Sequence, residues 1–374
     1  MNDKLTCTLY YNKKAATPHL WQIYTGFFEL QKRGFINVKM QRKDWWPGSY
    51  TENLLMVDID GQYKAIYDTN DGFNWIWGSE EENLEYFQKT LTPMADFYFK
   101  RSYNDQLLEY NGNTAGKIFP LGVNYELTSP ENKIDSINYN FKGWIKSRVR
   151  SVEWIRKSLK INNSVSQYSA FENAPWPKNK DPKILFLTRI WHPGNINKDK
   201  ISDPEVVEAL RQGLRDINQI RVDSIIECKK VFGDQFTGGL FSDSYSAQEY
   251  PDLVVPMNIT RKVNFMKLTK QSDICISTNG LHKSIAWKFG EYVSAARGII
   301  SEKLLYSLPG NFSSPTNYLI FKDVEQLIEN ISLLVNNKDI LREMMVANYH
   351  YYNLYIRPDN LILNTLLSIR ENVA

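Results

Sequence analysis

The sequence has few of the features that assign a protein to a class at once. Only three of its 374 residues are cysteines, at positions 7, 228 and 275. They lie far apart, show no paired spacing, and two of them stand in strand-like apolar runs. We therefore expect Cys7, Cys228 and Cys275 to be buried free thiols, which fits a reducing compartment better than a disulfide framework does.

Long apolar runs are missing as well. No stretch of 18 consecutive apolar residues occurs, and the amino-terminal sequence MNDKLTCTLYYNKK contains no apolar core of a secretion signal. A membrane-spanning helix and secretion are both unexpected for such a sequence. We predict a cytoplasmic protein.

The charge is nearly balanced. The 45 Lys and Arg residues are matched by 42 Asp and Glu, which gives a formal net charge of +3. Binding of nucleic acid needs a dense basic face, with stacking side chains beside it where the strand is single. The only dense basic run is one short segment, so we expect no nucleic-acid partner.

The length and the order of patterns predict two domains. A chain of 374 residues is too long for one ordinary core, and the run NAPWPKNKDP at 173–182 is typical of a linker. We expect a first domain at 1–127 completed by 355–374, a linking region at 128–182, and a second domain at 183–354.

Strand and helix patterns alternate in both halves, which is typical of α/β domains. In the first half we expect a helix that Thr17 caps and Gly34 closes, and a hairpin turned at Asp60-Gly61. The second half has a strand KILFLTRI at 183–190, followed by a Gly-Gly segment near 238. Further strands are predicted at 5–11, 36–41, 96–101, 117–122, 273–278, 298–301 and 317–321, and helices at 80–91, 203–232, 262–270 and from 323 to 372.

The segment that follows the strand DICIST carries the polar residues of interest. We expect a turn at Asn279-Gly280 and then a helix starting near Ser284. In an open α/β sheet, ligands bind beyond the carboxyl ends of the strands, where the free N–H groups of helix starts face anions. The sequence therefore predicts a diphosphate site at the start of this helix.

Four charged side chains fit that site. Lys283 and Lys288 would add positive charge, and Arg189 ends the first strand of the same half. Glu291, about two turns into the helix, would accept hydrogen bonds from the two adjacent hydroxyls of a ribose. The alternatives are a surface ion pair between Lys288 and Glu291 and a solvated strand end at Arg189.

Taken together, these segments resemble the GT-B glycosyltransferases, over most of the chain. The matching stretches are DFYFKRSYN (96–104), KIFPLGVNY (117–125), KILFLTRI (183–190), EYVSAARGIIS (291–301) and RPDNLILNTLL (357–367). The resemblance implies two Rossmann-like domains facing across a cleft, with the last helix crossing back to the first domain. It further implies that the second domain binds a nucleotide sugar and the first binds the acceptor.

The resemblance also implies roles for residues. Arg189 would contact the donor phosphates and Glu291 would hold the donor ribose, with Lys283, Ser284 and Lys288 beside them. Many retaining members carry a second Glu where this chain has Lys283, and the Lys that follows the phosphate-binding Arg is missing, so Lys283 or Lys288 would replace it. The residues leave retention or inversion of configuration open.

We expect no metal and no cofactor. A metal-dependent transferase would need an Asp-x-Asp motif for the donor, and Asp58-Ile59-Asp60 has the spacing but runs directly into a hairpin turn. The nucleotide sugar is then a substrate, and transfer is expected to be independent of metal.

The first half holds the candidates for the chemical step. Transfer that inverts configuration needs a carboxylate or a His to take the acceptor proton. We choose Asp71, in the turn after a strand, and His19, at the start of the first helix, over Asp68 in the same turn. The alternatives are an Asp that caps its own turn and a surface His. Three tryptophans would stack on sugars or pack in the core: Trp45, Trp46 and Trp75.

The basic segment 142–160 has an apolar stripe at helical spacing, with seven Lys or Arg and one acidic residue, Glu153. Such a helix would lie on an anionic leaflet, with Trp144 and Trp154 at the headgroups, and bring the protein to a lipid-linked acceptor. The alternative is a linker helix packed on the first domain by its stripe.

The sequence thus predicts a bacterial glycosyltransferase that moves a sugar from a nucleotide donor to a glycan or a lipid-linked acceptor in surface polysaccharide synthesis. It would act in the cytoplasm, at the inner face of the cell membrane. Two alternatives remain: a nucleotide-sugar epimerase or hydrolase of the same fold, and a non-catalytic glycan-binding protein.

Overall fold

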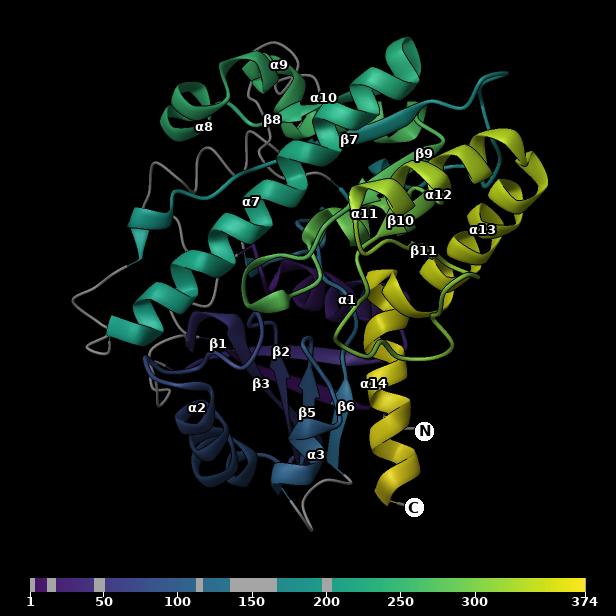
Figure 1. The fold of residues 1–374 in the computed structure, drawn as a ribbon. Helices are drawn as coiled ribbons and strands as arrows, with labels where there is room; N and C mark the ends of the chain where they lie inside the picture. The colour runs from purple at the N-terminus through teal and green to yellow at the C-terminus, as the bar shows by residue number, and fades with distance from the viewer. Residues whose placement is uncertain are drawn as a thin grey trace, which may run out of the picture. The chain divides into compact units, whose positions relative to one another are not determined.

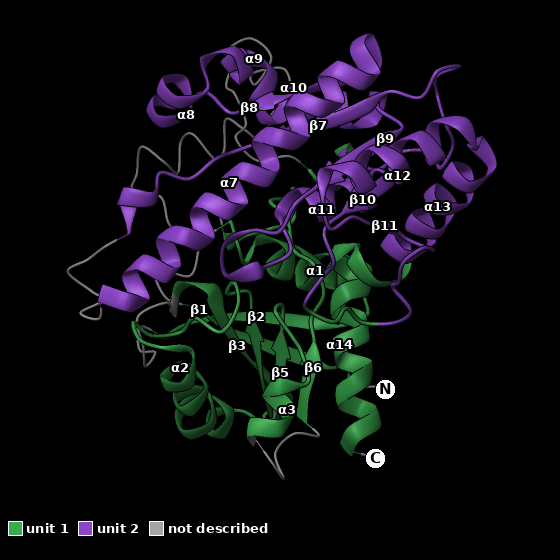
Figure 2. Cartoon of the chain, viewed as in Figure 1, with its two compact units in different colours: residues 1–170, 306–309, 354–374 green, residues 171–305, 310–353 purple. Residues whose placement is uncertain are grey.

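The structure is a computed structural model that describes residues 4–11, 18–43, 51–111, 117–134, 167–196 and 204–373. The chain divides into two compact units, drawn in two colours in Figure 2. Unit 1 comprises 1–170, 306–309 and 354–374, and unit 2 comprises 171–305 and 310–353. Each unit contains its own sheet with helices around it, so the predicted α/β class with two sheet-based units is confirmed (Figure 1).

Unit 1 is built on a six-stranded sheet of order β2-β1-β3-β4-β5-β6. Only β3 runs antiparallel to its neighbours, so the other strands all end at one edge. The strands are β1 (Thr6–Tyr11), β2 (Asn37–Arg42), β3 (Leu54–Ile59), β4 (Tyr63–Asp68), β5 (Phe97–Lys100) and β6 (Ile118–Pro120).

The hairpin between β3 and β4 is the one predicted from Asp60-Gly61. Both residues have positive φ, 53° and 70°, as a tight hairpin turn of this kind requires. Successive residues of β3 point to opposite faces of the sheet. Leu55 and Val57 join one apolar cluster, while Leu54 and Met56 join the other.

Helices cover both faces of this sheet. The cluster around Leu55 includes side chains of α1 (Trp21–Lys32) and α14 (Pro358–Val373), and the cluster around Leu54 includes side chains of α2 (Glu80–Tyr86) and α3 (Gln106–Asn111). The last helix therefore packs on unit 1, as the resemblance implied. Helix α1 begins at Trp21, later than expected, and its expected cap Thr17 lies outside the described residues.

The contact between α1 and α14 is a close one. A Cβ atom added at Gly26 of α1 would lie 2.2 Å from the carbonyl oxygen of Pro358 and 2.5 Å from the side chain of Ile362. The Tyr67 hydroxyl on β4 also shares a 2.8 Å hydrogen bond with Thr365 of α14. Only a glycine at position 26 allows this approach.

Unit 2 is built on a five-stranded sheet of order β11-β10-β9-β7-β8, in which all neighbouring pairs are parallel. The chain moves from β7 to β8 on one side and then returns to β9 on the other. This order places a topological switch point between β7 and β9. The strands are β7 (Ile184–Thr188), β8 (Phe236–Leu240), β9 (Ile274–Ser277), β10 (Gly298–Ser301) and β11 (Leu319–Ile320).

Helices of unit 2 also lie on its sheet. Side chains of α7, α12 and α13 share one apolar cluster with the strands, and α11 contacts β9 and β10. The helices are α7 (Pro204–Phe232), α8 (Ser244–Glu249), α9 (Met257–Thr260), α10 (Lys262–Gln271), α11 (Trp287–Ser294), α12 (Val324–Asn336) and α13 (Lys338–Tyr351).

Strand β8 was not predicted, because its Gly238-Gly239 pair is a poor strand signal. The two glycines are required by close neighbours. A Cβ at Gly238 would lie 2.1 Å from the ring of Phe236, and one at Gly239 would lie 2.7 Å from the carbonyl oxygen of Leu253. Strand β8 therefore contains glycines at the two positions where a larger side chain would not fit.

Several sequence predictions concern residues that the structure does not describe. Trp45, Trp46 and the basic segment 142–160 lie outside the described residues. No helix of the described ranges is long and apolar enough to cross a membrane. All three cysteines are buried and free, as expected.

Candidate functional site

Arg221 of α7 joins the two strand ends at the switch point of unit 2. Its Nε donates to Thr278 Oγ1 at 2.9 Å, just beyond β9, and its two Nη atoms donate to the carbonyl oxygens of Arg189 and Asn279 at 2.6 and 2.8 Å. The residue is only 4% exposed. Burial lowers the pKa of its guanidinium to about 10, against the opposing charge of Glu302.

Arg221 was not predicted from the sequence. It lies in the middle of a long helix that has many charged residues, and no local pattern distinguishes it from the half-buried Arg211 and the exposed Arg215. Its neighbours Val222 and Ile225 belong to the apolar cluster of the unit, so helical spacing places position 221 near the buried face. That periodicity is the one signal that would have found it.

Lys288, in the first turn of α11, also reaches the switch point between β7 and β9. Its Nζ donates to the carbonyl oxygen of Leu187, near the end of β7. Burial, and after it the charges of Arg221 and Arg189, lower the pKa of Lys288 to about 7, while the charge of Glu291 opposes this shift. Positive side chains from α7, α11 and the end of β7 therefore converge at the switch point.

Glu291 is one turn beyond Lys288 on α11 and is 3% exposed. It forms an ion pair with Lys262, the first residue of α10, whose ammonium also lies 5.2 Å from the centre of the Phe171 ring. The alternative of a surface pair between Lys288 and Glu291 is wrong, because each of them binds a different group.

The expected helix start at Ser284 is also wrong. Helix α11 begins at Trp287, since Ser284 and Ala286 have extended backbones with ψ of 153° and 145°. His282 and Lys283 precede them in a tight turn with φ of 55° and 56°. Ser284 is buried and Lys283 exposed, so the two residues belong to the turn between β9 and α11 and not to the helix start.

Arg189 presents an exposed guanidinium at the end of β7. Its guanidinium carbon lies 4.4 Å from the ring centre of Phe241, which follows β8. The side chain thus stacks on a ring at the carboxyl edge of the sheet, while its own carbonyl is held by Arg221. Of the predicted donor-binding residues, the structure brings Arg189, Lys288 and Glu291 to one edge.

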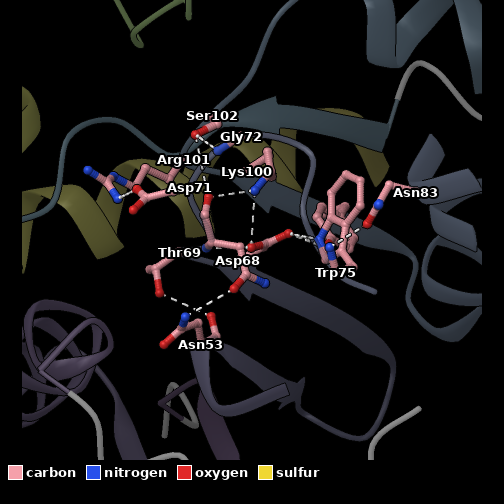
Figure 3. A network of polar contacts seen from close by, with 12 residues as sticks. Asn53, Asp68, Thr69, Asp71, Gly72, Trp75, Asn83, Lys100, Arg101 and Ser102 are labelled. Carbon is pink, nitrogen blue, oxygen red and sulfur yellow. Dashed lines mark hydrogen bonds and ion pairs between the residues drawn. The ribbon is translucent and has the colours of Figure 1, made fainter. Parts of the chain in front are cut away.

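Unit 1 has a buried polar network at the carboxyl edge of its sheet, centred on Asp68 at the end of β4 (Figure 3). The carboxylate is fully buried and accepts hydrogen bonds from Trp75 Nε1 and the Tyr98 hydroxyl, both at 2.6 Å. It also accepts from the backbone N–H of Asn70 at 2.8 Å and from Lys100 Nζ at 3.3 Å.

Lys100 completes that network from the end of β5. It is fully buried, and its Nζ donates to the carbonyl oxygen of Asn70 at 2.8 Å. Burial lowers the pKa of Lys100, and the charge of Asp68 opposes this. The pair of Asp68 and Lys100 fixes the turn that follows β4.

Trp75 is 1% exposed, and its ring stacks on Phe87 with 4.8 Å between the ring centres, so it is a core residue and not a platform for a sugar.

The same turn carries Asp71, and the structure brings it close to His19. Asp71 pairs with Arg101, which is 3% exposed (Figure 3). His19 stands in the turn before α1, where Asn124 Nδ2 donates to its carbonyl oxygen at 3.1 Å. Burial and the charge of Arg101 lower the pKa of His19, while Asp71 and a hydrogen bond to the backbone of Thr69 raise it.

Within the described ranges, no group of three or more His, Cys, Asp or Glu side chains is arranged to hold a metal ion.

Comparison with known proteins finds similarity only among solved structures. No family model matches the chain, and no curated protein matches its sequence. The carboxyl-terminal domain of a glycosyl transferase group 1 family protein from Francisella tularensis matches at 12% identity, over 51% of this chain and 97% of that one, with a TM-score of 0.33. A candidate UDP-N-acetylglucosamine 2-epimerase from Listeria monocytogenes matches at 9% identity, over 98% and 95%, with a TM-score of 0.42.

A third match is the pneumococcal O-GlcNAc transferase GtfA, solved with UDP and GlcNAc. It is 12% identical over 76% of this chain and 47% of its own, with a TM-score of 0.37, so the chain spans about half of GtfA. Two of these three proteins are glycosyltransferases, the group that the sequence resembles. The TM-scores are too low to carry a function over, so the function has to come from the chain's own residues.

Proposed function

We propose that the chain is a glycosyltransferase that transfers a sugar from a nucleotide-sugar donor to a glycan or a lipid-linked acceptor. The observation that carries the proposal is the convergence of Arg189, Lys288 and Glu291 at the switch point of unit 2. In parallel α/β sheets this is the place where nucleotides bind.

The chemistry of these groups matches the parts of a nucleoside diphosphate. Arg189 and Lys288 supply positive charge for the two phosphates, and the buried carboxylate of Glu291 accepts hydrogen bonds from vicinal ribose hydroxyls. Lys283 and Ser284, in the turn between β9 and α11, complete the proposed donor site. An anion at Lys288 would favour its protonated form and so restore the charge that burial removes.

For the chemical step we propose that His19 or Asp71 of unit 1 takes the proton of the acceptor hydroxyl. His19 has a lowered pKa and is therefore neutral at physiological pH, which leaves a ring nitrogen able to accept a proton. Asp71 is held by Arg101 in the same place. A general base of this kind contributes about 10²–10⁴-fold to a reaction rate.

We further propose that the enzyme works without a metal, in the cytoplasm, at the inner face of a bacterial membrane, in surface polysaccharide synthesis. The three buried thiols support a reducing compartment. Segment 142–160 would supply the membrane contact. Liposome flotation tests this: binding should need anionic lipid and be lost when Arg148, Arg150, Arg156 and Lys157 are replaced.

A melting screen tests the donor site first. A ligand that binds the folded chain raises the midpoint of unfolding. We expect one of UDP, GDP or dTDP, and then one nucleotide sugar, to raise it. The matching nucleotide sugar is then incubated without acceptor, where an epimerase or hydrolase would convert it or release free sugar. A chain that binds saccharides but no nucleotide would contradict the proposal.

A further inference from the structure

We propose that Arg221 is a positioning residue of the anion site: it holds the ends of β7 and β9 at the spacing that a diphosphate between them requires. The identity of the anion as part of a nucleotide rests on the function proposed above. The role of Arg221 at the switch point rests on its own contacts.

The contacts of Arg221 span the switch point. Three of its N–H groups bind acceptors on two different strand ends, one after β7 and two after β9. A guanidinium carries five N–H donors in a rigid fork. The remaining two have no hydrogen-bond partner among the described residues, although only 4% of the residue is exposed.

The charges around Arg221 favour an anion. Lys288 faces Arg221 and Arg189, and the carboxylate of Glu291 on its own helix is already paired with Lys262. The carboxylate that faces Arg221 is Glu302, which accepts a 2.7 Å hydrogen bond from the backbone N–H of Asn279. The three positive side chains at this place therefore outnumber the one carboxylate that faces Arg221. A bound diphosphate would reduce the repulsion between the positive side chains.

Arg221 influences the anion site by fixing the backbone at the ends of two strands. It fixes the carbonyl of Arg189, from which the exposed guanidinium of Arg189 projects, and it fixes the Thr278–Asn279 turn that leads to α11 and Lys288. Without it, three acceptors lose their donor, and both turns lose the constraint that sets their separation. Lysine cannot replace it, because one ammonium cannot reach three acceptors in the geometry of a planar fork.

The test measures binding of inorganic pyrophosphate to the full chain by calorimetry. We expect Arg221→Met to weaken binding at least tenfold, and Arg221→Lys and Thr278→Val, which keep the charge, to weaken it severalfold. Arg215→Met, on the exposed face of the same helix, is the matched control and should bind as the wild type does.

A second readout separates the effect of the charge of Arg221 on Lys288 from the effect of its hydrogen bonds. The pH profile of acetylation at Lys288, followed by mass spectrometry, reports the midpoint of its titration without any ligand. Arg221→Met should raise that midpoint, because one of the two facing cations is gone, whereas Arg221→Lys and Thr278→Val should leave it in place.

Each outcome decides. Folded Arg221→Met that binds pyrophosphate like the wild type, with an unmoved Lys288 midpoint, would overturn the inference. If that variant does not fold, wild-type affinity in both Arg221→Lys and Thr278→Val would overturn it equally, as would a wild-type chain that binds no pyrophosphate. Pyrophosphate binding that depends on Arg221, without binding of any nucleotide, supports the inference and contradicts the proposed function.

Discussion

Lys288, in the first turn of α11, donates a hydrogen bond to the carbonyl oxygen of Leu187 near the end of β7. This contact fixes the start of the helix against a strand that is not its immediate neighbour in sequence. The ammonium group is buried close to Arg189 and Arg221, and burial together with these two positive charges lowers the Lys288 pKa to about 7. Binding of an anion at this place is therefore linked to protonation.

Affinity for the nucleotide sugar should fall as pH rises. In the free protein Lys288 loses its proton above about pH 7, and bound diphosphate raises the pKa, so binding takes up a proton in the range between the two values. The dissociation constant should then rise up to about tenfold per pH unit across that range. Calorimetry from about pH 6 to about pH 9 measures it. Lys288→Arg, which does not titrate there, should remove the dependence.

Replacement of Glu291 by Gln should abolish the stabilisation by nucleotide. The amide keeps the shape of the side chain but loses the charge that pairs with Lys262 and that, in the proposed donor site, binds the ribose hydroxyls. We expect the rise in midpoint with the nucleotide found in the screen to disappear. Glu325→Gln, on an exposed position of α12, is the control. An unchanged rise in Glu291→Gln would exclude this carboxylate from the donor site.

Asp68→Asn should destabilise unit 1. Its carboxylate is fully buried and balances the buried charge of Lys100, and loss of one partner of such a pair costs about 3–5 kcal/mol. Urea unfolding measures the change. Asp105→Asn, at an exposed position of the same unit, should have an effect below about 0.5 kcal/mol. Equal stability of the two variants would show that the Asp68 network contributes little.

His19→Gln should lower the transfer rate about 10²–10⁴-fold and leave the affinity for the nucleotide unchanged. In the wild type, kcat should fall as pH drops through the lowered pKa of His19, below its usual value of about 6.5, because the protonated ring cannot accept a proton. Asp71→Asn is measured beside it. If transfer survives His19→Gln and is lost in Asp71→Asn, the carboxylate is the base.

Transfer should continue in the presence of EDTA. In the proposed donor site, Arg and Lys side chains would supply the positive charge that a divalent ion supplies in metal-dependent transferases. Initial rates with and without excess EDTA measure this directly. A rate that disappears with EDTA and returns with Mg²⁺ or Mn²⁺ would contradict it.

Much of the fold could be predicted because local signals and the tertiary structure agree. Asp60-Gly61 predicted its hairpin, because the turn needs positive φ at both positions. Gly34, with φ of 81°, ends α1 as expected. The carboxyl edge of unit 2 was also predicted, since the order of strands and polar ends placed Arg189, Lys288 and Glu291 near one another.

The rest depended on contacts between residues distant in sequence. Arg221 meets its partners across 32, 57 and 58 residues, and the pairing of Glu291 with Lys262 links two separate helices. Asp68 was considered as a turn residue, but its burial depends on Lys100, which no local spacing connects to it. Sequence periodicity identifies elements, whereas these pairs depend on how the elements pack.

The close contact of Gly26 with Pro358 has a consequence for synthesis of the chain. The apolar surface of α1 is completed by α14, which is synthesised after unit 2, so this surface stays uncovered while unit 2 emerges from the ribosome. During that interval a chaperone could bind the exposed apolar surface of the nascent amino-terminal half. A premature stop codon before residue 354 would leave this surface exposed and the truncated chain prone to aggregation.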